Sequence, residues 1–148
     1  MSVLPAELVA CARSWIGTRF HHQGRLKKTA LHRGGVDCLG LLVGVAGELD
    51  LMDRLGRPFV SGDIVDYSHL PDVEKLRYTL ADMMGEVSVD ELRLGDVLLM
   101  NVDGRAQHLG IVSDGLGIIH AYAPAKAVVE HLLDTWWMER IVAAFRVC

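Results

Sequence analysis

The sequence lacks several features that mark specialised protein classes. It has three cysteines, an odd number at wide spacing, which argues against a disulfide framework. Its longest uninterrupted apolar run, Leu39 to Gly47, is too short to cross a bilayer, so we expect no membrane association. It has 15 Lys and Arg against 19 Asp and Glu, and therefore no basic surplus with which to bind nucleic acid.

The beginning of the chain also lacks the charged segment of a secretory signal, because Arg13 is the first basic residue. We therefore expect the protein to be cytoplasmic at synthesis. What is present is an ordinary globular composition, with 148 residues of which 51% are hydrophobic and 23% charged. We expect residues 1–148 to form a single domain with its own core.

Hydrophobic spacing predicts helices in the first half of the chain and strands in the second. The predicted helices are Pro5 to Ile16, Cys38 to Leu51 and Pro71 to Met84. The predicted strands are Asp96 to Val102, Arg105 to Val112, Leu116 to Tyr122, Ala127 to Leu132 and Arg140 to Val147, with Asp103-Gly104 and Asp114-Gly115 as hairpin signals. This order predicts an α+β fold in which N-terminal helices pack on one face of a C-terminal antiparallel β-sheet.

One cysteine occupies a position with chemical meaning. Cys38 follows Asp37 at the predicted start of the second helix. Unpaired N–H groups and the positive end of the helix dipole favour a thiolate there, and the same N–H groups can hold an oxyanion. The alternative is that Asp37 only caps the helix and Cys38 is a small buried apolar residue.

A thiol nucleophile needs a base, and two histidines lie on neighbouring predicted strands. A two-residue turn at Asp114-Gly115 would place His108 and His120 on opposite faces of the sheet. A three-residue loop, Ser113 to Gly115, would pair Val112 with Leu116 and set His108 directly opposite His120. We choose the three-residue loop, because this class prefers glycine at its last position. Cys38, His108 and His120 then form a candidate nucleophile, base and orienting residue.

Four segments, in this order, resemble the sequence boxes of the NlpC-like cysteine peptidases. Val36 to Leu42, with Asp37-Cys38-Leu39-Gly40-Leu41 inside it, is similar to the family's Asp-Cys-Ser-Gly-Leu-Val box. Arg93 to Leu99 resembles its Gly-Asp strand, His108 to Val112 its His-Val-Gly-Ile box, and Ile119 to Ala121 its third polar position. The resemblance covers roughly Pro5 to Arg146, or most of the chain.

This resemblance implies a papain-like core and a hydrolytic reaction without a metal or organic cofactor. The implied substrate is a peptidoglycan stem peptide, with the amide from D-glutamate to a diamino acid as the expected bond. Cys38 would attack the carbonyl, His108 would act as acid and base, and His120 would fix the His108 tautomer. The opening, Ala12 to Thr18, and the ending around Trp137 are similar to a phage and gene-transfer-agent branch. That likeness implies phage-like tail proteins as partners and a particle that carries the enzyme to the cell wall.

Four further residues are expected to contact substrate. The family usually has a tyrosine near the position of Phe20, which has no hydroxyl to donate, and His21 or His22 is the expected substitute. Leu39 replaces the family's serine beside the nucleophile, and Asp37 is expected to cap the helix and also to bind a substrate amine.

Three other functions remain open from the sequence. The same triad could serve an acyltransferase, since water and an amine compete for the same acyl-enzyme. Because Phe20 and Leu39 depart from the family pattern, the chain could be a non-catalytic tail-assembly module on the same fold. Alternatively, Cys38, His108 and His120 could bind zinc, since one cysteine and two histidines leave an open fourth position.

Overall fold

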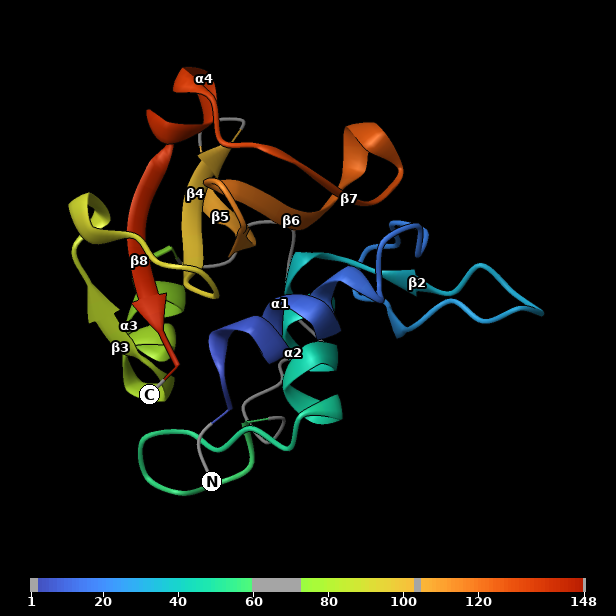
Figure 1. Ribbon diagram of the computed structural model, residues 1–148, viewed down its shortest axis with the longest axis horizontal. Helices are drawn as coiled ribbons and strands as arrows, with labels where there is room; N and C mark the ends of the chain where they lie inside the picture. The colour runs from blue at the N-terminus through green and yellow to red at the C-terminus, as the bar shows by residue number, and fades with distance from the viewer. Residues whose placement is uncertain (1–2, 60–72, 103–104, 148) are drawn as a thin grey trace.

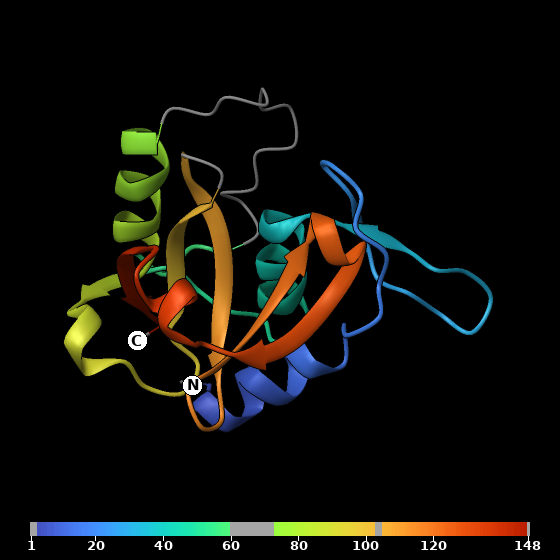
Figure 2. The ribbon, with the colours of Figure 1, turned by 90° about the horizontal axis from the view of Figure 1, so that it is seen from above.

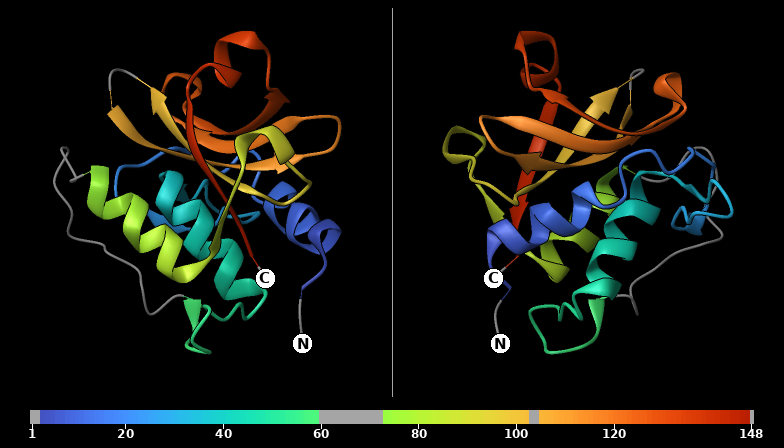
Figure 3. Two further views of the ribbon diagram at one scale, coloured as in Figure 1. Left: turned by 90° about the vertical axis from the view of Figure 1, so that its left-hand side faces the viewer. Right: turned by 45° about the vertical axis from the view of Figure 1, so that its right-hand side comes forward.

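The structure is a computed structural model that describes residues 3–59, 73–102 and 105–147. Helices cover one face of a six-stranded antiparallel sheet, which makes the fold α+β as predicted (Figure 1, Figure 3). The longer elements, in chain order, are α1 Pro5–Arg13, α2 Cys38–Glu48, α3 Val73–Met83, β3 Gly85–Val87, β4 Val97–Val102, β5 Arg105–Ser113, β6 Gly117–Tyr122, β7 Ala127–Leu132, α4 Thr135–Met138 and β8 Ile141–Arg146. No helix within these ranges is long and apolar enough to cross a membrane.

The sheet has the strand order β3-β8-β4-β5-β6-β7, which places β4 and β5 at its centre. Four consecutive residues of β4, Val97 to Met100, are at most 1% exposed. An alternating strand can bury every residue only when both of its faces are covered. The helices provide one cover, and α4 with Trp137 lies against the other face.

Each face of the sheet has its own apolar core. The larger core lies between the sheet and the helices, and includes Leu41, Val45, Leu109 and Ile111. The smaller core lies on the opposite face and consists of Leu98, Met100, Val112, Ile118, Leu133, Trp137 and Ala144. The helix that begins at Cys38 is thus anchored by burial of its apolar side against β5 and β6.

Most predicted elements are present, with shorter helices than expected. The first helix ends at Arg13 because the Ser14 hydroxyl donates to the Cys11 carbonyl, and Gly17 then turns the chain at a φ of 91°. The short strand β3 and the short helix α4 were not predicted, since neither is long enough to show a period. The hairpin signal at Asp103-Gly104 lies outside the described residues.

The loop between β5 and β6 has the predicted length, but its position differs by one residue. The ladder pairs Ser113 with Gly117, so the loop runs from Asp114 to Leu116 rather than from Ser113 to Gly115. Gly117 favours this register, because a Cβ atom there would lie 2.3 Å from the Ser113 hydroxyl. The predicted direct opposition of His108 and His120 is therefore wrong. The same register, continued, sets Gly110 opposite His120, and leaves His108 on the same face two residues away.

A two-stranded arm projects from the body of the fold next to the start of α2 (Figure 2). Its strands are β1 Arg25–Leu26 and β2 Gly35–Val36, and β2 leads directly into Asp37 and α2. The arm thereby covers the helix start from one side while the sheet lies on the other.

Candidate active site

Asp37 fixes the backbone at the beginning of α2. Its Oδ1 accepts a hydrogen bond from the Gly40 N–H at 2.8 Å, and its Oδ2 accepts one from the Gln23 N–H at 2.8 Å. The Arg25 guanidinium lies 3.1 Å from Oδ1, and Asp37 is only 4% exposed. The predicted capping role is therefore present, and the same carboxylate ties the arm to the helix. Binding of a substrate amine by Asp37 stays a prediction.

The arm approaches the first turn of α2 so closely that only glycine fits there. A Cβ atom on Gly40 would lie 2.2 Å from the Gly24 carbonyl oxygen and 3.1 Å from Arg25 Nη1. The missing side chain of Gly40 allows this contact between two backbones. The turn that carries Cys38 is thus held from outside by the arm.

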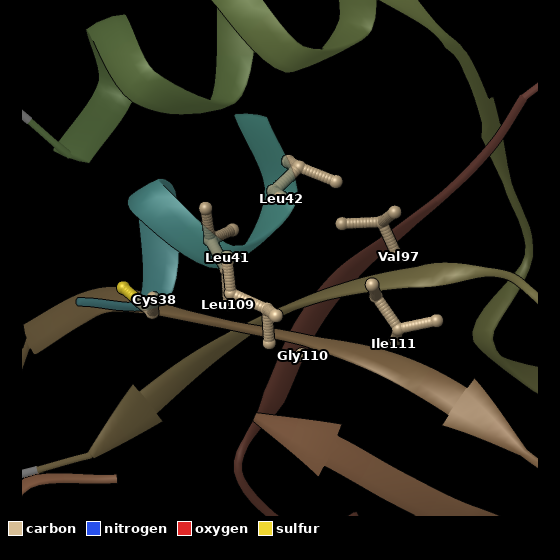
Figure 4. A pocket seen from close by; sticks show the side chains of 7 residues that line it. All are labelled: Cys38, Leu41, Leu42, Val97, Leu109, Gly110 and Ile111. Carbon is tan, nitrogen blue, oxygen red and sulfur yellow. The ribbon is translucent and has the colours of Figure 1, made fainter. Parts of the chain in front are cut away.

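Cys38 meets the sheet at the place where β5 and β6 separate. The ladder between these strands consists of the pairs Ile111–Ile119, Val112–Ile118 and Ser113–Gly117, and the earlier part of β5 is not paired with β6. Cys38 lines a small pocket there with Leu109 and Gly110, the two residues that follow His108 (Figure 4). The fold therefore brings the predicted nucleophile to the strand segment that carries the predicted base.

Burial raises the pKa of the Cys38 thiol to about 11, and the Asp37 carboxylate acts in the same direction. Hydrogen bonds from the backbone of Leu109, Leu39 and Cys38 favour the thiolate but do not outweigh burial. The expectation of a thiolate stabilised by the helix start is thus reversed in this state. The Cys38 thiol is neutral at pH 7.

His108 and His120 are in direct contact, as the sequence predicted. His108 Nε2 and His120 Nδ1 are 2.5 Å apart, and the ring centroids are separated by 4.8 Å. Burial lowers the pKa of His108 to about 4 and that of His120 to about 2, so both rings are neutral at pH 7. The bond uses Nε2 of His108, which leaves Nδ1 as the nitrogen able to act as a base.

Two aromatic rings hold His120 in place. Tyr122 stacks on it with a centroid distance of 5.0 Å and an interplanar angle of 18°. Trp137 meets it edge-on, also at 5.0 Å, and His120 is 0% exposed. A ring enclosed in this way has little freedom to rotate, which suits a residue that orients another.

A third histidine, which was not among the predicted site residues, continues the row. His131 Nε2 lies 2.8 Å from His120 Nε2, and His131 Nδ1 lies 2.9 Å from the Leu132 carbonyl oxygen. The β6–β7 ladder pairs Tyr122 with Ala127, and this register places His131 on the same face as His120. The sequence does contain a signal for this contact. Only four residues separate the predicted strands ending at Tyr122 and beginning at Ala127, and so short a connection indicates a hairpin.

The remaining predicted residues lie in different settings. Phe20 and Leu39 are partly buried and pack against the helix-side core. The Phe20 backbone also bridges Val36 of the arm, while the His22 carbonyl accepts a hydrogen bond from His21 Nδ1 at 2.9 Å. Contact of Phe20, His22 and Leu39 with substrate stays a prediction.

A zinc site is not present in the described part of the chain. Within residues 3–59, 73–102 and 105–147, no group of three or more His, Cys, Asp or Glu residues is arranged to hold a metal ion. His108 and His120 point nitrogens at each other instead of at a common centre.

No family model matches the chain. Among curated proteins it is 23% identical over 133 residues to the murein DD-endopeptidase MepS/murein LD-carboxypeptidase of Escherichia coli strain K12. That match covers 90% of this chain and 57% of the E. coli protein, so the chain spans little more than half of its curated relatives.

Solved structures agree over nearly the whole chain. The NlpC/p60 domain of the peptidoglycan hydrolase SagA aligns with a TM-score of 0.65 and 23% identity, covering 97% of this chain and 99% of that one. An NlpC/P60 family protein from Bacillus cereus aligns with a TM-score of 0.68 and 16% identity, covering 99% of this chain and 41% of that one. The peptidoglycan hydrolase RipB from Mycobacterium tuberculosis gives 0.62 and 19%, covering 97% and 64%. The chain therefore has the α+β fold of the NlpC/p60 domains.

Proposed function

We propose that the protein is a cysteine peptidase that hydrolyses amide bonds in peptidoglycan stem peptides. The observation that carries the proposal is the placement of Cys38 at a capped helix start beside the β5 segment that follows His108, whose ring is bonded to His120. The likeness to a murein endopeptidase and to peptidoglycan hydrolases supports the choice of substrate.

In this mechanism both partners begin neutral. As Cys38 Sγ attacks the scissile carbonyl carbon, its proton passes to Nδ1 of His108. The carbonyl oxygen becomes an oxyanion, and the backbone N–H groups at the start of α2 donate to it. His108 then gives the proton to the leaving amine, which leaves a thioester on Cys38.

Hydrolysis of the thioester repeats these steps with water. His108 removes a proton from the water molecule, the resulting hydroxyl bonds to the acyl carbon, and the Cys38 thiolate leaves and recovers the proton. His120 accepts the His108 Nε2–H throughout and so keeps Nδ1 available. No step requires a metal or an organic cofactor.

The bond that we propose lies between D-glutamate and the diamino acid of the stem. The E. coli relative is named a DD-endopeptidase and an LD-carboxypeptidase, which act elsewhere in the stem. Mass spectrometry of stem peptides after digestion distinguishes these bonds, because each leaves a different terminal residue on the fragments. Products cut only at a D,D or L,D bond would overturn the proposed bond and retain the proposed chemistry.

The decisive variant is Cys38→Ala, with Cys11→Ala as its control. Cys11 is also an unbridged thiol, but it lies on α1, where it hydrogen-bonds to Glu48. We expect Cys38→Ala to abolish hydrolysis of purified peptidoglycan while its thermal unfolding stays close to that of the parent. Cys11→Ala should keep full activity. Full activity in Cys38→Ala would contradict the assignment of Cys38 as the nucleophile.

The resemblance of the chain ends to the phage and gene-transfer-agent branch supports a second part of the proposal. We propose that tail proteins of a phage-like particle are its partners, and that the particle carries the enzyme, made in the cytoplasm, to the cell wall. Tail genes next to this gene, and the protein in purified particles, are the expected findings. Particles without the protein would contradict this part.

The raised pKa of Cys38 favours one competing function, a non-catalytic tail-assembly module on the same fold. Such a module would leave the wild-type protein without hydrolytic activity on any stem peptide. The Cys38→Ala experiment therefore separates the two functions, since only an enzyme can lose activity.

A further inference from the structure

The geometry points to His131 as a positioning residue that fixes the tautomer of His108 through His120. This inference rests on the proposed function, because it assigns the nitrogen that acts as the base. Three rings from three neighbouring strands lie in a row, and each link is a hydrogen bond between two nitrogen atoms or between a nitrogen and a carbonyl oxygen.

The donor-to-acceptor direction of the hydrogen bonds along the row is set where the row ends, at His131 and the Leu132 carbonyl. A carbonyl oxygen can only accept a hydrogen bond, so His131 Nδ1, 2.9 Å from the Leu132 oxygen, must carry the proton. When His131 has that single proton, its Nε2 has a lone pair and can only accept. The partner at 2.8 Å, His120 Nε2, must then be the donor.

The same reasoning passes the direction to the proposed base. A neutral His120 with its proton on Nε2 has a lone pair on Nδ1, which accepts from His108 Nε2. His108 therefore carries its proton on Nε2, and its Nδ1 lone pair is available to Cys38. Each neutral ring can therefore carry its proton on one nitrogen only, because the Leu132 carbonyl, which cannot donate, excludes the opposite direction of hydrogen bonding.

Without His131, no acceptor holds the proton of His120 on Nε2. His120 is 0% exposed and enclosed by Tyr122 and Trp137, so water does not readily replace a missing acceptor at its Nε2. An unpartnered buried N–H is costly, and the proton of His120 then moves to Nδ1, where it can donate to His108 Nε2. That tautomer of His120 forces the His108 proton onto Nδ1, which is then no longer a base.

The test compares His131→Phe, which keeps a ring without nitrogen, with His131→Gln, whose side-chain oxygen can still accept from His120. His32→Phe, at an exposed position in the arm, controls for the loss of a histidine. Two-bond proton–nitrogen NMR spectra of histidine-labelled protein at pH 7 report which nitrogen of His108 carries the proton. Thermal unfolding of each variant is measured alongside.

We expect the neutral His108 ring to carry its proton on Nε2 in the parent, in His131→Gln and in His32→Phe. In His131→Phe we expect the proton on Nδ1, or a mixture of the two neutral tautomers. We also expect kcat to fall about tenfold in His131→Phe with KM unchanged, and to be largely restored in His131→Gln. An unaltered His108 tautomer in a folded His131→Phe, or equal loss of kcat in the two variants, would overturn the inference. The NMR result does not depend on hydrolysis, so failure of the proposed function is seen separately, as activity retained by Cys38→Ala.

Discussion

His108 and His120 are joined by a hydrogen bond of 2.5 Å, although they are not opposite each other on the sheet. Gly110 occupies the position opposite His120, and a Cβ atom there would lie 2.4 Å from Ile118 Cδ1 and 3.4 Å from His120 Cβ. The absent side chain gives the His120 ring room to lean along the strand toward His108. The glycine of the His-Leu-Gly segment thus has a steric role in the contact.

The buried histidines make the stability of the protein depend on pH. The pKa values of His108 and His120 are lowered from 6.5 in the unfolded chain to about 4 and about 2 in the native state. Between pH 6.5 and pH 4 the unfolded state therefore binds protons that the native state does not, and stability falls as the pH falls. We expect a loss of about 2 kcal/mol per histidine on going from pH 7 to pH 5.

Urea unfolding at pH 7 and pH 5 measures this loss. The His120→Gln variant should show a smaller difference between the two pH values than the parent. The His32→Gln variant, at an exposed position, should show the same difference as the parent. Equal pH dependence in the parent and in His120→Gln would contradict the assignment.

The raised pKa of Cys38 predicts its alkylation profile. With a pKa of about 11, the thiolate fraction rises about tenfold for each pH unit between 6 and 10. We expect the iodoacetamide rate, followed on the Cys38 peptide by mass spectrometry, to rise in the same way. A rate already at its plateau near pH 6 would instead indicate a preformed thiolate–imidazolium pair and a different starting state for catalysis.

Close contact between the arm and α2 predicts that Gly40 cannot be enlarged. We expect Gly40→Ala to destabilise the protein by about 1–3 kcal/mol, because its Cβ atom would lie 2.2 Å from the Gly24 carbonyl oxygen. The control is Gly47→Ala in the same helix, at an exposed position, where alanine should be neutral or stabilising by up to about 1 kcal/mol. Thermal unfolding measures the stability of both variants. Equal stability would show that the arm moves to accommodate the added Cβ atom.

A buried ion pair secures the strand that precedes the site. Asp96 is 1% exposed, and both of its carboxylate oxygens contact Arg146, at 2.8 and 2.9 Å. Arg146→Ala removes both contacts and leaves the buried Asp96 carboxylate with the Arg93 N–H, at 2.8 Å from Oδ2, as a remaining donor. Because Arg146 itself is partly exposed, the loss should be about 3 kcal/mol, at the lower end for a broken buried pair. The exposed pair Arg77–Glu86 is the control, and Arg77→Ala should cost less than about 1 kcal/mol. Similar losses in the two variants, measured by urea unfolding, would contradict this reading.

The sequence predicted the faces of the sheet better than it predicted the pairing. Moving the β5–β6 loop by one residue shifts every pair by two positions, so His108 and His120 kept their common face while losing direct opposition. The error arose from assigning the last left-handed position to Gly115. The structure has left-handed backbone at both Gly115 and Leu116, with φ of 65° and 56°, and a leucine there gives no sequence signal.

Features that depend on burial were beyond reach of the sequence. The position of Cys38 at a helix start was predicted and is present, but the direction of its pKa depends on how deeply the sulfur lies against Leu109. His131 was not predicted, because its role depends on the register between β6 and β7, which the short connection between the two strands indicates but neither strand shows by itself. Local patterns located the elements, while contacts between distant elements determined the chemistry.

The row of histidines ends on the main chain, at the carbonyl of Leu132, whose residue is 69% exposed. Every amino acid has that carbonyl, proline included, so substitutions at this position can change the surface of the protein without deleting the acceptor. The acceptor that ends the row is therefore part of the strand backbone and does not depend on the side chain. It also adds no buried negative charge. Replacement of Leu132 by another residue should therefore leave the direction of the hydrogen bonds along the row unchanged.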